Sequence, residues 1–405
     1  MDEREQRGQV IADGGKLRQK NGLWIVPSQH GAGTYVVDPA DAKASCSCPD
    51  FETRGLKCKH VYAVEYTMRR ETSASGETTV TESLRVSYTQ EWSAYNAAQT
   101  TEKERVAALL HGLCAAIDNP IYKRGRPRLP LADAVFAAVM KVYGTTSGRR
   151  AMVDMRDYAA KGYIDKAPCY NSIFNVFENP AITPLLKAMI EESARPLHAV
   201  ESDFAVDSSG FGSSVYARWF DHKYGREVAA SEWVKAHIMI GVKTNVVTSV
   251  EVTPGHYNDS PQLPRLLTAT AARFRVAEVS ADRAYIGHDN LAAIDAVGAF
   301  PLIPFKSSNV RTSVKTRSPE SRALWTRMHD FFTHNREEFL QHYHKRSNVE
   351  TTFSMIKAKF GARVRSKTPV AQVNEVLCKV LCHNLCCLVS AFYELGIEAT
   401  FWNAA

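Results

Sequence analysis

Four residues between positions 343 and 357 have side chains of the types that bind a phosphodiester beside a metal ion. Tyr343, Arg346, Glu350 and Lys357 follow one another at intervals of three, four and seven positions. An α-helix turns by about 100° per residue and would place all four side chains within an arc of roughly 60°. One carboxylate would then lie between two cations and a phenol, which is an unusual face for a core helix.

Two acidic residues upstream stand at the ends of apolar segments. Asp207 follows the apolar residues 204–206 and precedes Ser and Gly residues, which predicts a short buried strand ending in a polar turn. Asp282 follows a second apolar segment, residues 276–281, and a helix is expected to begin near His288. Asp203 and Asp289 are neighbouring alternatives, one early in its strand and the other inside the next helix.

Three carboxylates from distant parts of a chain are enough to hold a pair of divalent ions. Mg²⁺ takes carboxylate oxygens and keeps several waters. Two such ions about 3.5–4 Å apart activate the attacking oxygen and stabilise the leaving oxygen of a phosphodiester. A single aspartate near a strand end is ordinary in a chain with 43 acidic residues, so the interpretation depends on the combination with Glu350.

The spacing Y-(2)-R-(3)-E-(6)-K resembles the signature of insertion-sequence transposases of the DDE type, over roughly residues 200–390. The resemblance implies an RNase-H-like fold, with Asp207 in the middle of the opening strand, Asp282 ending a later strand and Glu350 on a helix against the sheet. It implies that these three residues hold two Mg²⁺ or Mn²⁺ ions, and that Tyr343, Arg346 and Lys357 bind phosphates near the scissile bond.

The resemblance also implies an activity. Water would cut DNA at the ends of the insertion sequence and release a 3′-OH, which would then join target DNA. Members of this family act in synaptic multimers, so a dimer or larger assembly is expected. Two alternatives stay open: a transposase-derived DNA-binding regulator without catalysis, and a nuclease of the same fold. The complete set of three carboxylates and the Tyr-Arg-Glu-Lys face argue against the regulator.

The residues between the two aspartates and beyond Asp282 give further expectations. Residues 237–255 predict two strands joined by a tight turn at Thr244 and Asn245, and residues 260–274 predict a helix with Ser260 as its N-cap. His237 and Trp325 are interpreted as structural residues. Trp325 also has the placement for an aromatic wedge against a flipped base. Cysteines at helical spacing are interpreted as core: Cys378, Cys382 and Cys386.

Basic residues follow Glu350 closely. Clustered cations beside acidic ligands suit a polyanionic substrate, so this segment is interpreted as a DNA contact rather than as a solvated charged face. The DNA-contact residues predicted here, in addition to Tyr343 and Arg346, are Lys357, Lys359, Arg363 and Arg365.

A second motif lies near the N-terminus. Cys46, Cys48, Cys58 and His60 have the spacing C-x-C-x9-C-x-H and form a complete tetrahedral zinc set. The arrangement resembles a SWIM-type zinc finger, with strands expected at residues 23–28 and 33–39 and a helix after His60. Four protein ligands leave no open position, so one structural Zn²⁺ is expected. A disulfide pair is the alternative, and whether the module binds DNA or protein stays open.

The expected fold class is α/β: an RNase-H-like mixed sheet flanked by helices, preceded by a helical DNA-binding region and a small zinc module. The expected domains are a zinc finger at 20–70, a linker at 71–99, a helical DNA-end-binding region at 100–198 and a catalytic domain at 199–392. Within the helical region, helices are predicted at 131–143, 148–160, 170–178 and 184–194, after a capping box at Thr101 and Glu104. The basic segment 123–130 is either a DNA contact or an ordinary loop.

Composition agrees with an intracellular DNA-binding protein. The chain has 405 residues, a formal net charge of +7 and 45% hydrophobic residues, enough for two or three cores. Nine cysteines, three of them expected zinc ligands, indicate a reducing compartment. The charged start MDEREQRGQV does not resemble a signal peptide. No apolar run is expected to span a membrane, so no membrane partner and a cytoplasmic, nucleoid-associated location are expected.

Overall fold

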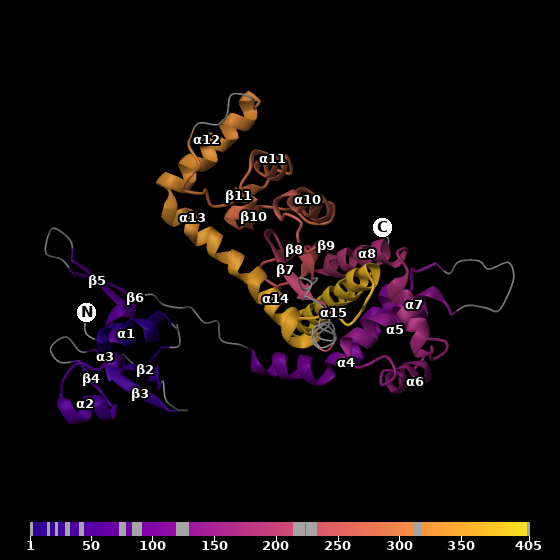
Figure 1. Cartoon of the computed structure of the whole chain (residues 1–405), viewed down its shortest axis with the longest axis horizontal. Coiled ribbons are helices and arrows are strands. Elements are labelled where there is room, and N and C mark those ends of the chain that lie inside the picture. The colour runs from indigo at the N-terminus through magenta and orange to yellow at the C-terminus, as the bar shows by residue number, and fades with distance from the viewer. Residues whose placement is uncertain are drawn as a thin grey trace. The chain divides into compact units, whose positions relative to one another are not determined.

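The computed structural model describes residues 3–13, 17–20, 23–28, 33–39, 44–72, 78–82, 91–118, 129–213, 223, 233–311 and 317–402. The chain forms two compact units, Met1–Thr89 and Gln90–Ala405 (Figure 1). The basic segment 123–130 lies outside the described residues, apart from Leu129 and Pro130.

The first unit is built on a four-stranded antiparallel sheet. Its strands, in spatial order, are β1 (Arg18–Lys20), β2 (Leu23–Pro27), β3 (Thr34–Asp38) and β4 (Ser45–Cys46). Its helices are α1 (Glu3–Asp13), α2 (Pro49–Arg54) and α3 (Lys59–Thr67), and α1 packs against α3. The two strands predicted around residues 23–28 and 33–39, and the helix after His60, are confirmed.

The segment predicted as a linker contains regular structure. β5 (Met68–Thr72) and β6 (Thr78–Glu82) pair as an antiparallel hairpin, although Ser/Thr-rich composition had predicted a flexible chain there. The first helix of the second unit, α4 (Trp92–Cys114), begins well before Thr101. The capping box predicted at Thr101 is therefore wrong. The hydroxyl of Thr101 donates instead to the carbonyl of Ala97 within the helix.

Short helices follow α4, as predicted. They are α5 (Leu131–Tyr143), α6 (Met152–Ala160), α7 (Tyr170–Glu178), α8 (Ile182–Ala194) and the 3₁₀ turn η1 (Arg195–Leu197). The bounds of α5 and α7 agree with the prediction to the residue, because apolar side chains at helical spacing define their buried faces. α6 begins four residues later than predicted and α8 two residues earlier.

A five-stranded mixed sheet follows. Its strands are β7 (Asp203–Gly212), β8 (Trp233–Gly241), β9 (Val247–Pro254), β10 (Glu278–Ala281) and β11 (Phe300–Leu302). The spatial order is β11-β10-β7-β8-β9, with β7, β8 and β9 antiparallel and β10 and β11 parallel to β7. This is the RNase-H-like arrangement, and the tight turn between β8 and β9 is confirmed by the left-handed Asn245.

β7 is longer than residues 204–207 alone predicted. It pairs with β8 along its whole length, through the polar residues that had been interpreted as a turn. Gly210 is needed there because a β-carbon would lie 2.6 Å from the ring of Trp233 on β8. Asp207 is consequently in the middle of the strand, as the family resemblance implied.

Helices cover both faces of the sheet. η2 (Ser260–Gln262), α10 (Leu263–Ala271), η3 (Arg283–Tyr285) and α11 (His288–Ala296) precede β11. α12 (Pro319–His334), α13 (Arg336–Tyr343), η4 (His344–Arg346), α14 (Ser347–Phe360) and α15 (Pro369–Leu395) follow it. α10 and α11 lie on one side of the sheet, and α14 and α15 lie on the other (Figure 1). Ser260 begins a 3₁₀ turn, so its predicted role as the N-cap of α10 is wrong.

The segment 343–357 is not one continuous α-helix. Tyr343 ends α13, Arg346 lies in the 3₁₀ turn η4, and only Glu350 and Lys357 belong to α14. A 3₁₀ turn advances about 120° per residue instead of 100°, so the ideal helical face predicted for the four side chains is altered at Arg346.

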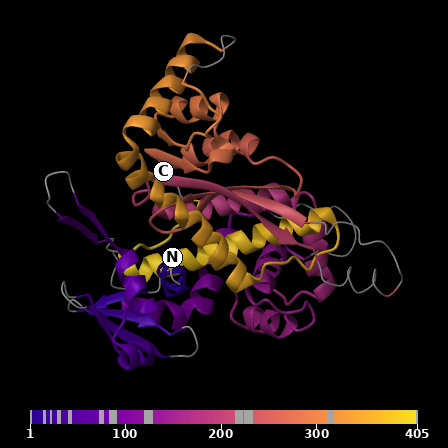
Figure 2. The same ribbon diagram turned by 60° about the vertical axis from the view of Figure 1, so that its left-hand side comes forward.

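The C-terminal helix α15 is the centre of the second unit. It contacts α4, α5, α7, α8, α14 and β9, so the helices of residues 92–194 and the sheet share one hydrophobic core (Figure 2). Cys378 and Cys382 are buried in that core and Cys386 is half-buried, which confirms their interpretation as packing residues. By length and composition α15 could span a membrane, which corrects the expectation that no apolar run is long enough. However, 78% of its most apolar stretch is buried within the unit.

Asn384 ties this core together by hydrogen bonds. Its side-chain amide donates to the carbonyls of Ile190 on α8 and Val247 on β9 and to the hydroxyl of Ser193, and its carbonyl accepts from the N–H of Val247. It is fully buried. A buried polar group that loses its partner costs free energy.

We therefore expect Asn384→Ala to lower the free energy of unfolding of the second unit by about 2–4 kcal/mol, because the Val247 N–H would stay buried without an acceptor. Urea denaturation followed by circular dichroism measures this. Asn175→Ala, on the exposed side of α7, is the matched control and should change stability by no more than about 0.5 kcal/mol. Equal stability of the two variants would contradict the assigned role.

Candidate metal centres and nucleic-acid interface

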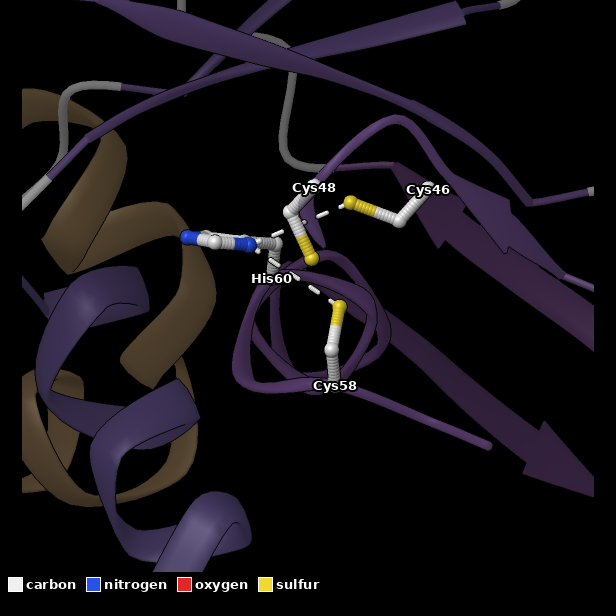
Figure 3. A group of neighbouring side chains, drawn as sticks. All are labelled: Cys46, Cys48, Cys58 and His60. Carbon is white, nitrogen blue, oxygen red and sulfur yellow. Dashed lines mark hydrogen bonds between the residues drawn. The ribbon is translucent and has the colours of Figure 1, made fainter. Parts of the chain in front are cut away.

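Four side chains of the first unit converge as predicted. The ligand atoms of Cys46, Cys48, Cys58 and His60 all lie within 4.8 Å of one another (Figure 3). Nδ1 of His60 is 3.9 Å from Sγ of Cys46 and 3.8 Å from Sγ of Cys58. Ligands about 2.0–2.3 Å from a tetrahedral zinc ion lie roughly 3.5–3.8 Å apart, so the cluster has the dimensions of a structural zinc site.

Each ligand is placed by a different local structure. Cys46 ends β4, whose pairing with β3 fixes its direction. Cys48 is the N-cap of α2, Cys58 directly precedes α3, and His60 lies in the first turn of α3. One ligand pair therefore comes from the end of a strand and the other from the start of a helix.

The set of side chains favours a metal over a disulfide. A disulfide would join two of the three cysteines, whereas one zinc ion uses all three cysteines and His60 as ligands. The hydrogen bond between Cys46 and Cys58 lowers the pKa of the Cys58 thiol and raises that of the Cys46 thiol, and burial raises the pKa of Cys48. A zinc ligand must be a thiolate. The core of this unit is also small: besides the three cysteines, seven of its described residues are buried and apolar, so the unit needs a further source of stability.

Purified protein should carry about one zinc ion per chain. We expect Cys58→Ser combined with His60→Ala to release that zinc and unfold the first unit, since the small core alone cannot hold the strands together. Elemental analysis and limited proteolysis measure the two effects. Cys169→Ser, which removes an exposed cysteine of the second unit, should keep the zinc. Zinc-free wild-type protein prepared under reducing conditions would exclude the site.

Two of the candidate catalytic carboxylates lie where the central strand β7 pairs with its neighbour β10. β7 and β10 are parallel, and their register pairs Asp203 with Glu278 and Val206 with Ala281. One step further along the same register, Asp207 and Asp282 follow as neighbours. Asp282 ends its strand and accepts a hydrogen bond from the N–H of Arg283 at the start of η3. The sheet thus brings together two aspartates that are 75 positions apart in the sequence.

Glu350 joins them from α14, which packs against β7. Arg346 connects the two elements: its Nη1 donates to Oδ2 of Asp207 at 3.1 Å, and its Nη2 donates to Oε1 of Glu350 at 2.5 Å. Burial raises the pKa of Asp207, and the negative charges of Asp282 and Glu350 raise it further, while the N–H of Ser208 and the guanidinium of Arg346 lower it. The three carboxylates therefore share one electrostatic environment.

The donor set suits a hard divalent cation. Three carboxylates offer only oxygen ligands, and a cationic guanidinium already bridges two of them. Among the described residues, only the Cys₃His cluster draws its ligand atoms within 4.8 Å of one another. Arg346 lies between Asp207 and Glu350 and bonds to both.

The two alternative aspartates have other partners. Asp203 binds Nζ of Lys345 at 2.7 Å, and the same lysine contacts Glu278 on β10. Asp289 pairs with Arg317, and its side chain is 80% exposed. Asp203 therefore lies at the opposite end of the β7–β10 pair from Asp207, and Asp289 is exposed to solvent, whereas Asp207 shares the partner Arg346 with Glu350.

Tyr343 and Lys357 flank the carboxylates. The ring of Tyr343 lies 5.8 Å from the guanidinium of Arg346 and stacks on Phe339. Nζ of Lys357 donates to the hydroxyl of Ser209, which is two residues after Asp207 and on the same face of β7. The 3₁₀ turn therefore still leaves Tyr343, Arg346, Glu350 and Lys357 along one side of the strand.

The segment after α14 presents cations from a fixed backbone. Buried Lys379 donates to the carbonyls of Gly361 and Arg363, and buried Glu375 accepts from the N–H groups of Arg365 and Ser366. Val364 bonds to Gly212 at the end of β7. With the backbone held in this way, three side chains extend outward and are exposed: Arg363, Arg365 and Lys367.

Lys359 differs from the other predicted DNA contacts. Its Nζ binds both carboxylate oxygens of Glu102 on α4, and the same carboxylate accepts from the hydroxyl of Tyr143. The structure thus gives Lys359 a partner within the core instead of placing it beside Arg363 and Arg365.

Several residues near the site were not singled out as ligands. Tyr285 lies on η3, three positions after Asp282, and its buried hydroxyl has no hydrogen-bond partner. His237 is buried and bonds Thr253 through Nε2, and Trp325 is buried and donates to the carbonyl of Val310, which supports a structural role for both. In the sequence, Tyr285 could have been found from its position three residues after the strand-ending aspartate.

Comparisons with known proteins agree with these sites. Residues 198–385 match the family model of the transposase DDE domain, and residues 35–68 match that of the SWIM zinc finger. The first match contains β7, β10 and α14 with all three candidate carboxylates, and the second contains the whole Cys₃His cluster. Searches against curated proteins and against solved structures give no significant match. The chain therefore combines a SWIM zinc finger with a transposase DDE domain.

Proposed function

We propose that the protein is an active DNA transposase that cuts DNA at the ends of its insertion sequence and joins the freed 3′-OH to target DNA. The observation that carries the proposal is the convergence of Asp207, Asp282 and Glu350 from β7, β10 and α14, within a domain that matches the transposase family. A DNA-binding regulator has no need of three carboxylates grouped on the central strands of a sheet and the helix against them.

Each carboxylate would serve as a ligand for Mg²⁺ or Mn²⁺, and two ions bound there would supply activation of the attacking oxygen and stabilisation of the leaving oxygen. Arg346 and Lys357 lie beside these ligands and would orient the scissile phosphate. Tyr343 packs against the guanidinium and would hold it in place. Acidic ligands repel the negatively charged phosphates of the substrate. Cations next to the carboxylates are therefore required for the substrate to approach.

The exposed cations of residues 363–367 extend this surface. Because Val364 is bonded to the end of β7, Arg363 and Arg365 lie beside the end of the strand that carries Asp207. We propose that they bind the DNA backbone beside the cleavage point. The helices of residues 100–198 are proposed to contact the element end, and the active form is proposed to contain at least two copies, as the resemblance implies.

Asp207→Asn, Asp282→Asn and Glu350→Gln should each reduce cleavage and strand transfer by about a thousandfold or more, without loss of DNA binding. The amide keeps the shape of the carboxylate but cannot bind a hard cation as strongly. The substrate is a plasmid carrying the DNA that flanks the gene, with Mg²⁺ or Mn²⁺ present, and products are resolved on sequencing gels.

Asp289→Asn is the matched control for these variants, because Asp289 is exposed and paired with Arg317; it should retain activity. Substantial cleavage by any one of the three variants would remove that residue from the metal site. Cleavage by the wild type without strand transfer would favour a nuclease, and DNA binding without either reaction would favour a regulator.

Arg363→Ala combined with Arg365→Ala should weaken DNA binding and lower the slope of log K against log salt by about 2, since each arginine would contribute one phosphate contact. Fluorescence anisotropy at several salt concentrations measures the slope. Lys359→Ala should leave the slope unchanged, because Lys359 is paired with Glu102. A larger effect from Lys359 than from the two arginines would place the DNA on a different face.

A further inference from the structure

Arg346 occupies the position between two carboxylates that a metal ion would otherwise take. Its two terminal nitrogens bind Asp207 on β7 and Glu350 on α14, at 3.1 and 2.5 Å. Asp282 makes no ion pair within the described part of the chain. The guanidinium thus neutralises two of the three candidate ligands and leaves the third available.

The two ends of this bridge differ in their exposure to solvent. The side chain of Arg346 is 18% exposed and that of Asp207 is 22% exposed, whereas that of Glu350 is 60% exposed. An ion pair with one solvated partner contributes little net stability. The contact with Glu350 therefore costs little to break, although it is short.

The neighbouring cation, Lys345, binds a different pair of acidic residues from those that Arg346 binds. Lys345, in the same 3₁₀ turn, binds Asp203 and Glu278 at the other end of the β7–β10 pair. These two consecutive residues extend in opposite directions along β7 and fix η4 across the strand. With Lys345 holding the turn, Arg346 can exchange its partners without releasing α14 from the sheet.

On the basis of the proposed function, we propose that Arg346 is a displaceable stand-in cation. In DNA-free protein it neutralises Asp207 and Glu350; when divalent ions take these carboxylates, its guanidinium moves to a phosphate of the bound DNA. Arg346 is thereby a positioning residue that couples metal binding to DNA binding.

The physical basis is competition for the same groups. The carboxylates bind either the guanidinium or a metal ion, and the guanidinium binds either the carboxylates or a phosphate. Each binding event releases the group that the other requires, so metal and DNA strengthen each other's binding. Such coupling is reciprocal and typically amounts to several-fold to a hundredfold in affinity.

The first test measures metal binding without DNA. Full-length zinc-loaded protein is titrated with MnCl₂ by isothermal titration calorimetry. We expect Arg346→Gln to bind Mn²⁺ about tenfold more tightly than the wild type, because the competing cation is gone. Lys357→Gln removes the same charge from a side chain that contacts Ser209 and no carboxylate, and its change should be clearly smaller.

Unchanged or weaker Mn²⁺ binding by Arg346→Gln would overturn the stand-in role. An equal gain in Mn²⁺ affinity in Lys357→Gln would overturn it too, because the gain would then reflect only the loss of a positive charge near the site. Glu350→Gln should bind Mn²⁺ poorly. If it binds as the wild type does, the proposed metal site itself is wrong, and the two failures are thus distinguished.

The second test measures DNA binding without added divalent ions, by anisotropy of a labelled 30-base-pair duplex at low salt. Glu350→Gln frees one side of the guanidinium and should tighten binding by about fivefold in the wild-type background and much less in Arg346→Gln. An equal gain in both backgrounds would mean simple relief of charge repulsion and would contradict the proposal.

Discussion

The parallel pairing of β7 with β10 is the constraint on which the candidate catalytic site depends. A one-residue slip in this register would turn one strand's carboxylate to the opposite face of the sheet. The observed register places Asp207 beside Asp282, and the antiparallel pairing of β7 with β8 keeps the strand extended past Asp207 to Gly212. That extension brings Ser209 to Lys357 and lets Val364 bond to the strand end.

The second constraint is the clamp of η4 across β7. Lys345 and Arg346 bind carboxylates at opposite ends of the strand pair, so α14 cannot slide along the sheet without breaking both contacts. The two residues of this clamp have different roles. The Lys345 contacts lie away from the candidate ligands, whereas the Arg346 contacts join two of those ligands directly.

The first unit follows a different principle of stability. Its strands are short and its core is small, so the arrangement of Cys46, Cys48, Cys58 and His60 is both its chemical feature and its main constraint. The second unit has one core from α4 to α15. Its buried polar residues, such as Asn384, Glu375 and Lys379, connect elements that are far apart in the sequence.

The sequence by itself determined the features that are local. The zinc ligands span only 15 positions, and α5 and α7 have apolar side chains at helical spacing, so short-range geometry was sufficient to predict them. The spacing of Tyr343, Arg346, Glu350 and Lys357 also named a segment that the structure places against β7. Combined with the family resemblance, it gave the RNase-H-like class and the middle-strand position of Asp207.

The tertiary structure decided what depends on distant partners. Residues 204–212 are a single strand because β8 supplies hydrogen bonds from another part of the chain, which local composition does not record. Lys359 is close to the predicted DNA contacts in sequence, yet its charge is taken by Glu102, 257 positions away. The bridge from Arg346 to Asp207 likewise spans 139 positions. A charged side chain takes its role from the partner that the fold brings to it, and periodicity along the chain does not contain that information.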